Sequence, residues 1–85
     1  MVYSPRLEKF HGVTIDDISR LVGVQLGKRL VKADDRFLED LGAESMDVVN
    51  IAAAIEDKYR IRIKESEIAG IRTPSDLLRL IQKRL

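Results

Sequence analysis

The sequence predicts one small all-α domain, and three observations point to it. Apolar residues recur at spacings of three and four in three separate stretches, which is the period of a helix with one buried face. Thr14 and Thr73 are each followed three residues later by aspartate, a pattern typical of helix starts. The chain has 85 residues, 45% of them hydrophobic, which is enough for one modest core.

The first helix is expected to begin near Thr14. Residues 1–12 show mixed charge without a period, so we expect a loosely ordered lead-in there and a single domain over residues 13–85. The expected inward face of the helix is Ile15, Ile18, Val22, Leu26 and Leu30. Gly23 and Gly27 fall within this pattern, where each either weakens the helix by about 1 kcal/mol relative to alanine or permits close packing.

A long connection follows, from about Lys32 to Glu44, and we expect its apolar residues Phe37, Leu38 and Leu41 to fold over the core. The second helix is predicted over residues 45–59. Its expected inward stripe is Val49, Ala52, Ile55 (or its neighbour Ala53) and Tyr59. The three alanines in a row, residues 52–54, favour close helix packing over space for a bound chain.

The last third of the chain is expected to hold one extended loop and two helical segments. Ile61 and Ile63 alternate with arginines, but one strand would have no partner, so we predict a loop with both isoleucines turned inward. Residues 65–69 fit a short helical turn. Thr73 is the expected N-cap of the final helix, whose inward face should be Leu77, Leu78, Ile81 and Leu85.

The formal net charge is only +1, but charge is unevenly distributed along the chain. Residues 1–33 carry a balance of +3, residues 34–58 carry −6, and residues 59–85 carry +4. The acidic centre suggests a surface that meets basic partners. Since no apolar run approaches the roughly 20 residues that span a bilayer, we expect no transmembrane segment. With no secretory signal in the first dozen residues, the default expectation is a cytoplasmic protein.

The segment DLGAESMD, residues 40–47, resembles the acyl carrier protein family, whose hallmark is an acidic residue, a serine and an aliphatic residue opening the second helix. The resemblance continues through VVNIAAAIEDKY (residues 48–59), Ile61, Ile63 and TPSDL (residues 73–77). It covers roughly residues 12–85. It implies a four-helix bundle with a short third helix and a long loop between the first two helices.

The resemblance also implies a function for Ser45. A phosphopantetheinyl transferase would use magnesium and coenzyme A to attach a 4'-phosphopantetheine arm to this serine. The terminal thiol of the arm would hold acyl groups as thioesters for partner enzymes of fatty-acid, polyketide or related synthesis, and the chain itself would not be an enzyme. A serine at a helix start is reachable from solvent, and the positive helix end favours a phosphodiester there.

The sequence departs from the family pattern at several positions. Glu44 stands where aspartate is usual and Met46 where leucine is usual, while Val48 and Asn50 occupy positions where polar or acidic residues are common. Since typical fatty-acid carriers are strongly acidic, near-neutral charge favours a specialised member serving a dedicated pathway. We expect a monomer whose acyl-loading, acyl-transfer or synthase partners present basic docking patches. The expected docking residues are Glu44, Met46, Asp47, Val48, Asn50, Glu56 and Asp57.

Other classes of function fit less well. The only histidine, His11, lies in the lead-in and no G-x-S-x-G elbow occurs, which argues against a serine hydrolase. The chain has no cysteine, and its acidic centre lacks the spacing of a calcium loop, so we expect no metal site. The alternative is a non-catalytic helical module that binds protein or nucleic acid, with Ser45 only a helix N-cap. The basic residues of the chain, however, build no recognition helix, so we expect no nucleic-acid partner.

Overall fold

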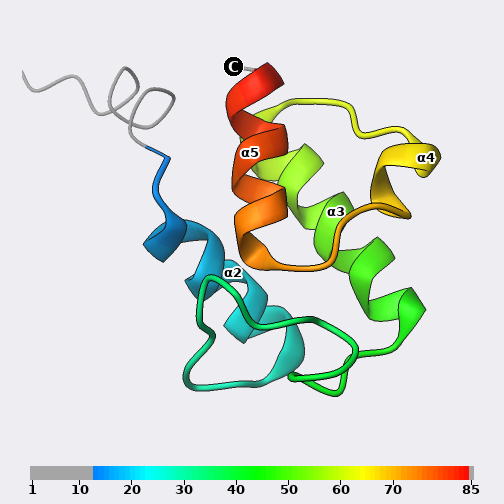
Figure 1. Ribbon diagram of the computed structural model, residues 1–85. Helices are drawn as coiled ribbons and strands as arrows, with labels where there is room; N and C mark the ends of the chain where they lie inside the picture. Colours follow the sequence, from blue (N-terminus) through cyan, green and yellow to red (C-terminus); the bar gives the residue numbers. More distant parts are fainter. Residues whose placement is uncertain (1–12, 85) are drawn as a thin grey trace, which may run out of the picture.

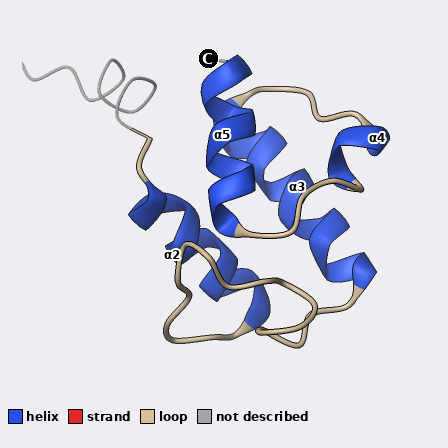
Figure 2. Cartoon of the chain, in the orientation of Figure 1, coloured by secondary structure: helices blue, strands red, loops and turns tan. Residues whose placement is uncertain are grey.

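The computed structural model describes residues 13–84, and within that range it contains four helices and no strand (Figure 2). The helices are α2 (Ile15–Leu26), α3 (Ser45–Tyr59), α4 (Glu65–Ile68) and α5 (Pro74–Arg84). Helices α2, α3 and α5 pack together, and the short α4 lies beside α3 on the side away from α2 (Figure 1). The predicted all-α class, short third helix and long first connection are confirmed. The expected lead-in, including His11, lies outside the described residues, as does Leu85.

Helix α2 begins as the sequence predicts but ends earlier. The Asp17 amide donates to Thr14 Oγ1 at 3.3 Å and the Thr14 amide donates to Asp17 Oδ2 at 3.0 Å, which closes a capping box. The helix stops at Leu26 because Gly27 adopts a left-handed conformation, with φ of 68°. The expectation that Leu30 continues the buried face is therefore wrong, since its side chain is 72% exposed.

The turn after α2 depends on Gly23 as well. The Lys28 amide donates to the Gly23 carbonyl at 2.8 Å, which folds the chain back on the helix. A Cβ atom on residue 23 would lie 2.7 Å from the Lys28 carbonyl oxygen, a contact too short for any larger residue without a shift of the backbone. Of the two expectations for Gly23, close packing is the one that the structure supports.

Helix α3 occupies the predicted residues, but its buried face is rotated from the predicted one. The buried residues are Val48, Ile51, Ala52, Ile55 and Tyr59. Val49, expected inside, is 44% exposed, and Ala53 is also exposed. Apolar residues occupy nearly every position from 48 to 55, so the sequence fits more than one choice of buried helix face. In the folded domain, the face of α3 that carries Val48 and Ile51 is the buried one.

The long connection from 27 to 44 is fixed to the rest of the domain at Phe37. The Phe37 amide donates to the Arg72 carbonyl at 2.9 Å, and the Phe37 carbonyl accepts from the Ala43 amide at 2.8 Å. Phe37 and Leu41 are buried as predicted, but Leu38 is 50% exposed, so its expected role as a core anchor is wrong.

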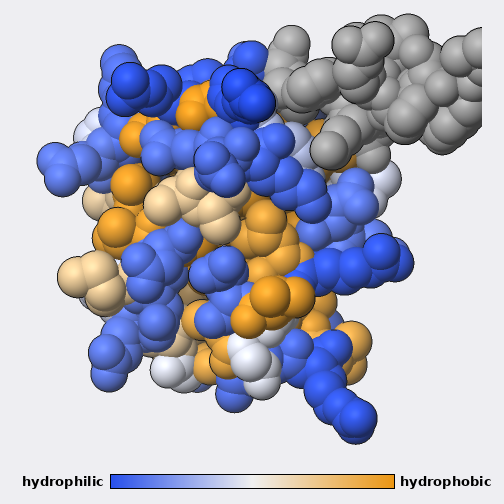
Figure 3. All heavy atoms as spheres, turned by 180° about the vertical axis from the view of Figure 1, so that it is seen from behind, coloured by the Kyte–Doolittle hydropathy of each residue, from blue (hydrophilic) through white to orange (hydrophobic). Residues whose placement is uncertain are grey.

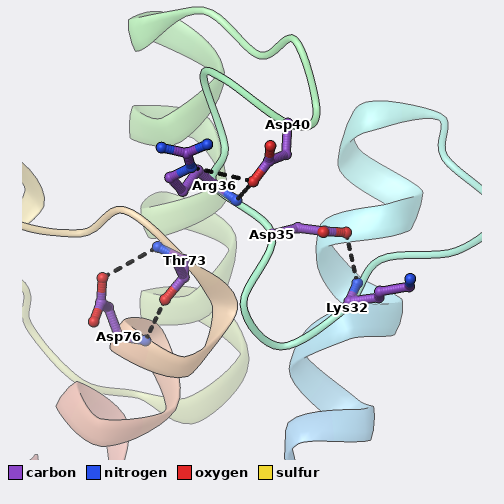
Figure 4. Close-up of polar contacts among 6 residues, drawn as sticks. All are labelled: Lys32, Asp35, Arg36, Asp40, Thr73 and Asp76. Carbon is purple, nitrogen blue, oxygen red and sulfur yellow. Dashed lines mark hydrogen bonds and ion pairs between the residues drawn. The ribbon is translucent and has the colours of Figure 1, made fainter.

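Two aspartates of this connection bind its own backbone (Figure 4). Asp35 accepts from the Lys32 amide at 2.8 Å, and Asp40 accepts from the Arg36 amide at 2.8 Å and from Arg36 Nε at 3.2 Å. The amide and guanidinium hydrogen bonds from Arg36 lower the pKa of Asp40. These carboxylates therefore stabilise the turns that lead to α3.

The segment between α3 and α5 follows the sequence expectations. Ile63 is buried and Ile61 is half-buried, in an extended loop as predicted. In α5, Leu77 and Ile81 are fully buried, Leu80 joins them although it was not predicted, and Leu78 is half-buried. In the part of the chain described, no helix has the length and apolar character that crossing a bilayer requires.

The start of α5 is held by reciprocal hydrogen bonds between Thr73 and Asp76 (Figure 4). Partial burial acts to raise the pKa of Asp76, but hydrogen bonds from the Arg72 and Thr73 amides and from Arg79 outweigh it, so the pKa is lowered. A carboxylate whose pKa is lowered on folding stabilises the fold above its unfolded pKa, and this contribution disappears as pH falls through the folded pKa.

We therefore expect Asp76→Asn to lower the free energy of unfolding by about 1 kcal/mol at neutral pH, because a neutral amide lacks the charge that strengthens the bonds from the Arg72 and Thr73 amides and from Arg79. The difference from the wild type should shrink once pH falls below the ordinary aspartate pKa of 3.8. Urea unfolding followed by circular dichroism at a series of pH values measures both effects. The exposed Asp34→Asn is the control, and an Asp76→Asn penalty that does not vary with pH would contradict the ionic origin of the effect.

Candidate functional site

Ser45 is the first residue of α3, and its side chain is exposed. The N-cap is Glu44, not Ser45, so the interpretation of Ser45 as a helix N-cap is wrong. The Glu44 amide donates to Asp47 Oδ2 at 2.9 Å and the Asp47 amide donates to the Glu44 carbonyl at 2.9 Å, and neither bond uses the serine hydroxyl. The hydroxyl therefore stays available for chemistry.

The exposed serine is nevertheless held in place by buried neighbours. Leu41 and Ala43 are buried just before it, and Val48 is buried one turn after it. The backbone amides of the first helical turn point out of the helix end near the hydroxyl, where the helix dipole is positive. A phosphate ester on Ser45 would thus lie in a favourable electrostatic environment.

Ser45 also lines a groove of about 460 Å³ formed by three separate segments. Its walls come from the connection before α3, from α3 itself, and from α4 together with three of the residues that follow it. The lining residues are Phe37, Leu38, Glu39, Ser45, Val48, Val49, Glu65, Ile68, Ala69, Ile71 and Arg72. Most of these are apolar, and the volume lies in the range of pockets that take small organic ligands.

Comparison with known proteins decides the family. A family model described as "Phosphopantetheine attachment site" matches residues 16–81. An acyl carrier protein of Wolinella succinogenes is 42% identical over 69 residues, covering 79% of this chain and 91% of the relative. One from Chlamydia trachomatis is 35% identical over 71 residues, covering 81% and 92%. The chain belongs to the acyl carrier protein family.

Solved structures agree with this assignment. The acyl carrier protein of Thermotoga maritima superposes with a TM-score of 0.70 at 30% identity, covering 82% of this chain and 84% of that one. A 3-oxo-butyl carrier protein from the actinorhodin polyketide synthase of Streptomyces coelicolor gives 0.70 at 32% identity, covering 86% and 91%. As an acyl carrier protein, the chain has phosphopantetheine as its cofactor.

The docking residues expected for this carrier do not all lie at its surface. Val48 is only 8% exposed and packs in the core, so its expected place in the docking surface is wrong. The buried face of α3 is rotated from the predicted one, and Val48 lies on it. Glu44, Met46, Asn50 and Asp57 are exposed. Two further expected residues, Asp47 and Glu56, are half-buried, and their carboxylates accept hydrogen bonds from the Glu44 amide at 2.9 Å and the Ile63 amide at 2.7 Å.

The expected docking residues also lie at two ends of one helix. Glu44 and Asp57 are thirteen positions apart, or about 20 Å along α3 at 1.5 Å per residue. Glu44, Met46 and Asn50 therefore lie near Ser45, whereas Glu56 and Asp57 lie at the opposite end of α3. The structure does not bring the seven residues into one patch around the serine.

Sequence reasoning missed the groove. Leu38 was assigned to the core, Val49 was given the wrong face, and Ile68 was not singled out, yet all three line the groove beside Ser45. The available signal was an excess of apolar residues around the serine, beyond what one buried stripe can accommodate. The alanines at 52–54 do not line the groove, and Ala52 is buried in the core.

Exposed apolar side chains also occur away from the groove. Figure 3 shows the molecule from behind, with apolar atoms at the surface among charged ones. Val24 and Leu30 are the most exposed large apolar residues, and neither lines the groove. Among residues 13–84, no group of three or more acidic or histidine side chains is arranged to hold a metal ion.

Proposed function

We propose that Ser45 bears the phosphopantetheine arm and that the chain presents acyl thioesters to its partners without catalysing a reaction itself. The observation that carries this proposal is an exposed hydroxyl at the first position of α3, not needed for the cap, at the edge of an apolar groove. The arm supplies the thiol that holds the acyl group. Ser45 supplies the oxygen atom of the phosphodiester, and the amides at the start of α3 stabilise its negative charge.

The groove gives the carrier a place for its cargo. An apolar acyl chain on the arm starts from Ser45, and Leu38, Val48 and Val49 are among the apolar residues that line the same groove. Burying the chain there removes apolar surface from water at about 25 cal/mol per Å². This favours an acyl cargo of the fatty-acid or polyketide type.

The surface around Ser45 suggests how partners dock. Glu44 offers a negative charge to a basic patch, and the exposed Met46 and Val49 offer apolar contact beside it. The phosphopantetheinyl transferase and the acyl-loading, acyl-transfer or synthase enzymes would all need to reach this one residue. A small monomer suits that role because each partner must bind and leave, and a cytoplasmic location is part of the same proposal.

The test is intact-protein mass spectrometry after incubation with coenzyme A, magnesium and a broad-specificity phosphopantetheinyl transferase. We expect a gain of one phosphopantetheinyl group, and peptide mapping should place it on Ser45. Acyl coenzyme A used in place of coenzyme A should give the corresponding acylated protein. No gain with several transferases, or a gain on another serine, would contradict the proposal and favour the interaction-module alternative.

A further inference from the structure

Helix α4 is a short part of the groove wall. It contains only four residues, none of them buried, and a helix this short is not stable by itself. It nevertheless supplies Glu65 and Ile68 to the groove that Ser45 also lines. In Figure 1 it lies at the outer edge of the bundle, next to α3. Whatever holds α4 in place also determines the shape of the groove.

The chain is firmly fixed on both sides of α4. Before it, Ile63 is buried and its amide donates to Glu56 Oε2 at 2.7 Å. After it, Ile71 is buried in the core. Between these two points, the side chain of Ile68 packs only partly against the core. Residues 64–70 therefore form a short bridge that needs another contact to hold it against the bundle.

Glu67 supplies that contact. Its Oε1 atom accepts from the Lys64 amide at 2.9 Å, and its Oε2 atom pairs with the guanidinium of Arg84 in the last turn of α5. Three other ion pairs occur within residues 13–84, and each joins residues three or four apart in sequence. The Glu67–Arg84 pair alone joins two elements, across 17 positions, and both side chains are about three-quarters buried.

We propose that the Glu67–Arg84 ion pair is a latch that holds α4 against the bundle and so determines how firmly the groove holds an acyl chain. Glu67 and Arg84 are positioning residues in this scheme, since neither lines the groove. The effect of the latch on the acyl chain rests on the proposed function of Ser45 as the site of the arm. The hydrogen bond from the Lys64 amide, followed by that from Arg84, lowers the pKa of Glu67, so both contacts favour the charged carboxylate.

The latch is tested first on the protein without its arm. Arg84→Met removes the charge but keeps an apolar stem and leaves the bond from the Lys64 amide to Glu67 intact. The matched control is Arg79→Met, which removes an arginine from the same helix and breaks its pair with Asp76 within α5. Hydrogen exchange is followed at the amides of Ile68 and Ala69, which bond to the Lys64 and Glu65 carbonyls.

We expect these amides to exchange about two- to fivefold faster in Arg84→Met, the range that a partly exposed ion pair supports, and to be unchanged in Arg79→Met. Arg84→Lys, which keeps the charge, should restore part of the protection. Equal exchange rates in the two methionine variants would overturn the latch. This comparison does not depend on Ser45, so it separates failure of the latch from failure of the proposed function.

The second measurement is cleavage of the acylated protein by hydroxylamine, which attacks an accessible thioester. In the wild type, an octanoyl thioester should be cleaved more slowly than an acetyl thioester because the longer chain is held in the groove. Arg84→Met should bring the two rates closer together, whereas Arg79→Met should not. Faster exchange of α4 with an unchanged ratio of cleavage rates would overturn the claim that the latch controls the groove.

Discussion

Replacing Ser45 with alanine is expected to abolish attachment of the phosphopantetheine arm completely and to leave the fold intact. The hydroxyl is the only group that the substitution removes, and the side chain that bonds the backbone at this helix start is that of Asp47. The change in free energy of unfolding should stay within about 0.5 kcal/mol, as for most surface substitutions. Intact mass after the transferase reaction measures the first effect, and urea unfolding measures the second.

The control for Ser45→Ala is Ser66→Ala. Ser66 is also exposed and also lies in the first turn of a helix, α4, but it does not line the groove. Its variant should accept the arm as the wild type does. If Ser45→Ala still gained the arm, the site would lie elsewhere. If it unfolded, the hydroxyl would have a structural role that the capping geometry gives no reason to expect.

The largest effect on stability is expected from Phe37→Ala, at about 3–5 kcal/mol. Phe37 is 1% exposed and is the largest of the fully buried side chains. Its removal leaves a cavity where the long connection meets the rest of the domain. A domain of this size has a total stability of roughly 4–13 kcal/mol, so the loss is a large part of the whole. Urea unfolding monitored by circular dichroism measures it.

The neighbouring Leu38 provides the matched control for Phe37→Ala. Leu38→Ala removes an apolar side chain of similar size one position away, but that side chain is half exposed, so we expect a loss below about 1 kcal/mol. Phe37→Leu keeps most of the volume and should cost less than Phe37→Ala. Similar losses for the two alanine variants would show that Phe37 does not anchor the connection.

The Phe37 contacts also link stability to function. The connection from Phe37 to Glu44 leads directly into Ser45, and the Ala43 amide is bound to the Phe37 carbonyl. Loosening this segment would loosen one wall of the groove, which Phe37 itself lines. The residue that holds the loop therefore also shapes the site.

Local signals in the sequence determined most of the helical framework and the position of the serine. Thr14 with Asp17 and Thr73 with Asp76 marked two helix starts, because a capping box is formed by residues three apart and needs no distant partner. The start of α3 at Ser45 and its end at Tyr59 were also predicted from the residues along the chain. Ser45 was singled out by the resemblance to carrier proteins, and its role stays a prediction.

Only the tertiary structure decided which apolar residues face inward and which form the site. Between residues 48 and 55 the run of apolar side chains fits several choices of buried face, and packing in the folded domain buries Val48 and leaves Val49 exposed. The turn at Gly27 removed Leu30 from the core. The groove and the Glu67–Arg84 latch join segments far apart in the chain, so no local pattern could indicate them. Burial depends on what packs against a residue, and a single sequence carries little information about that partner.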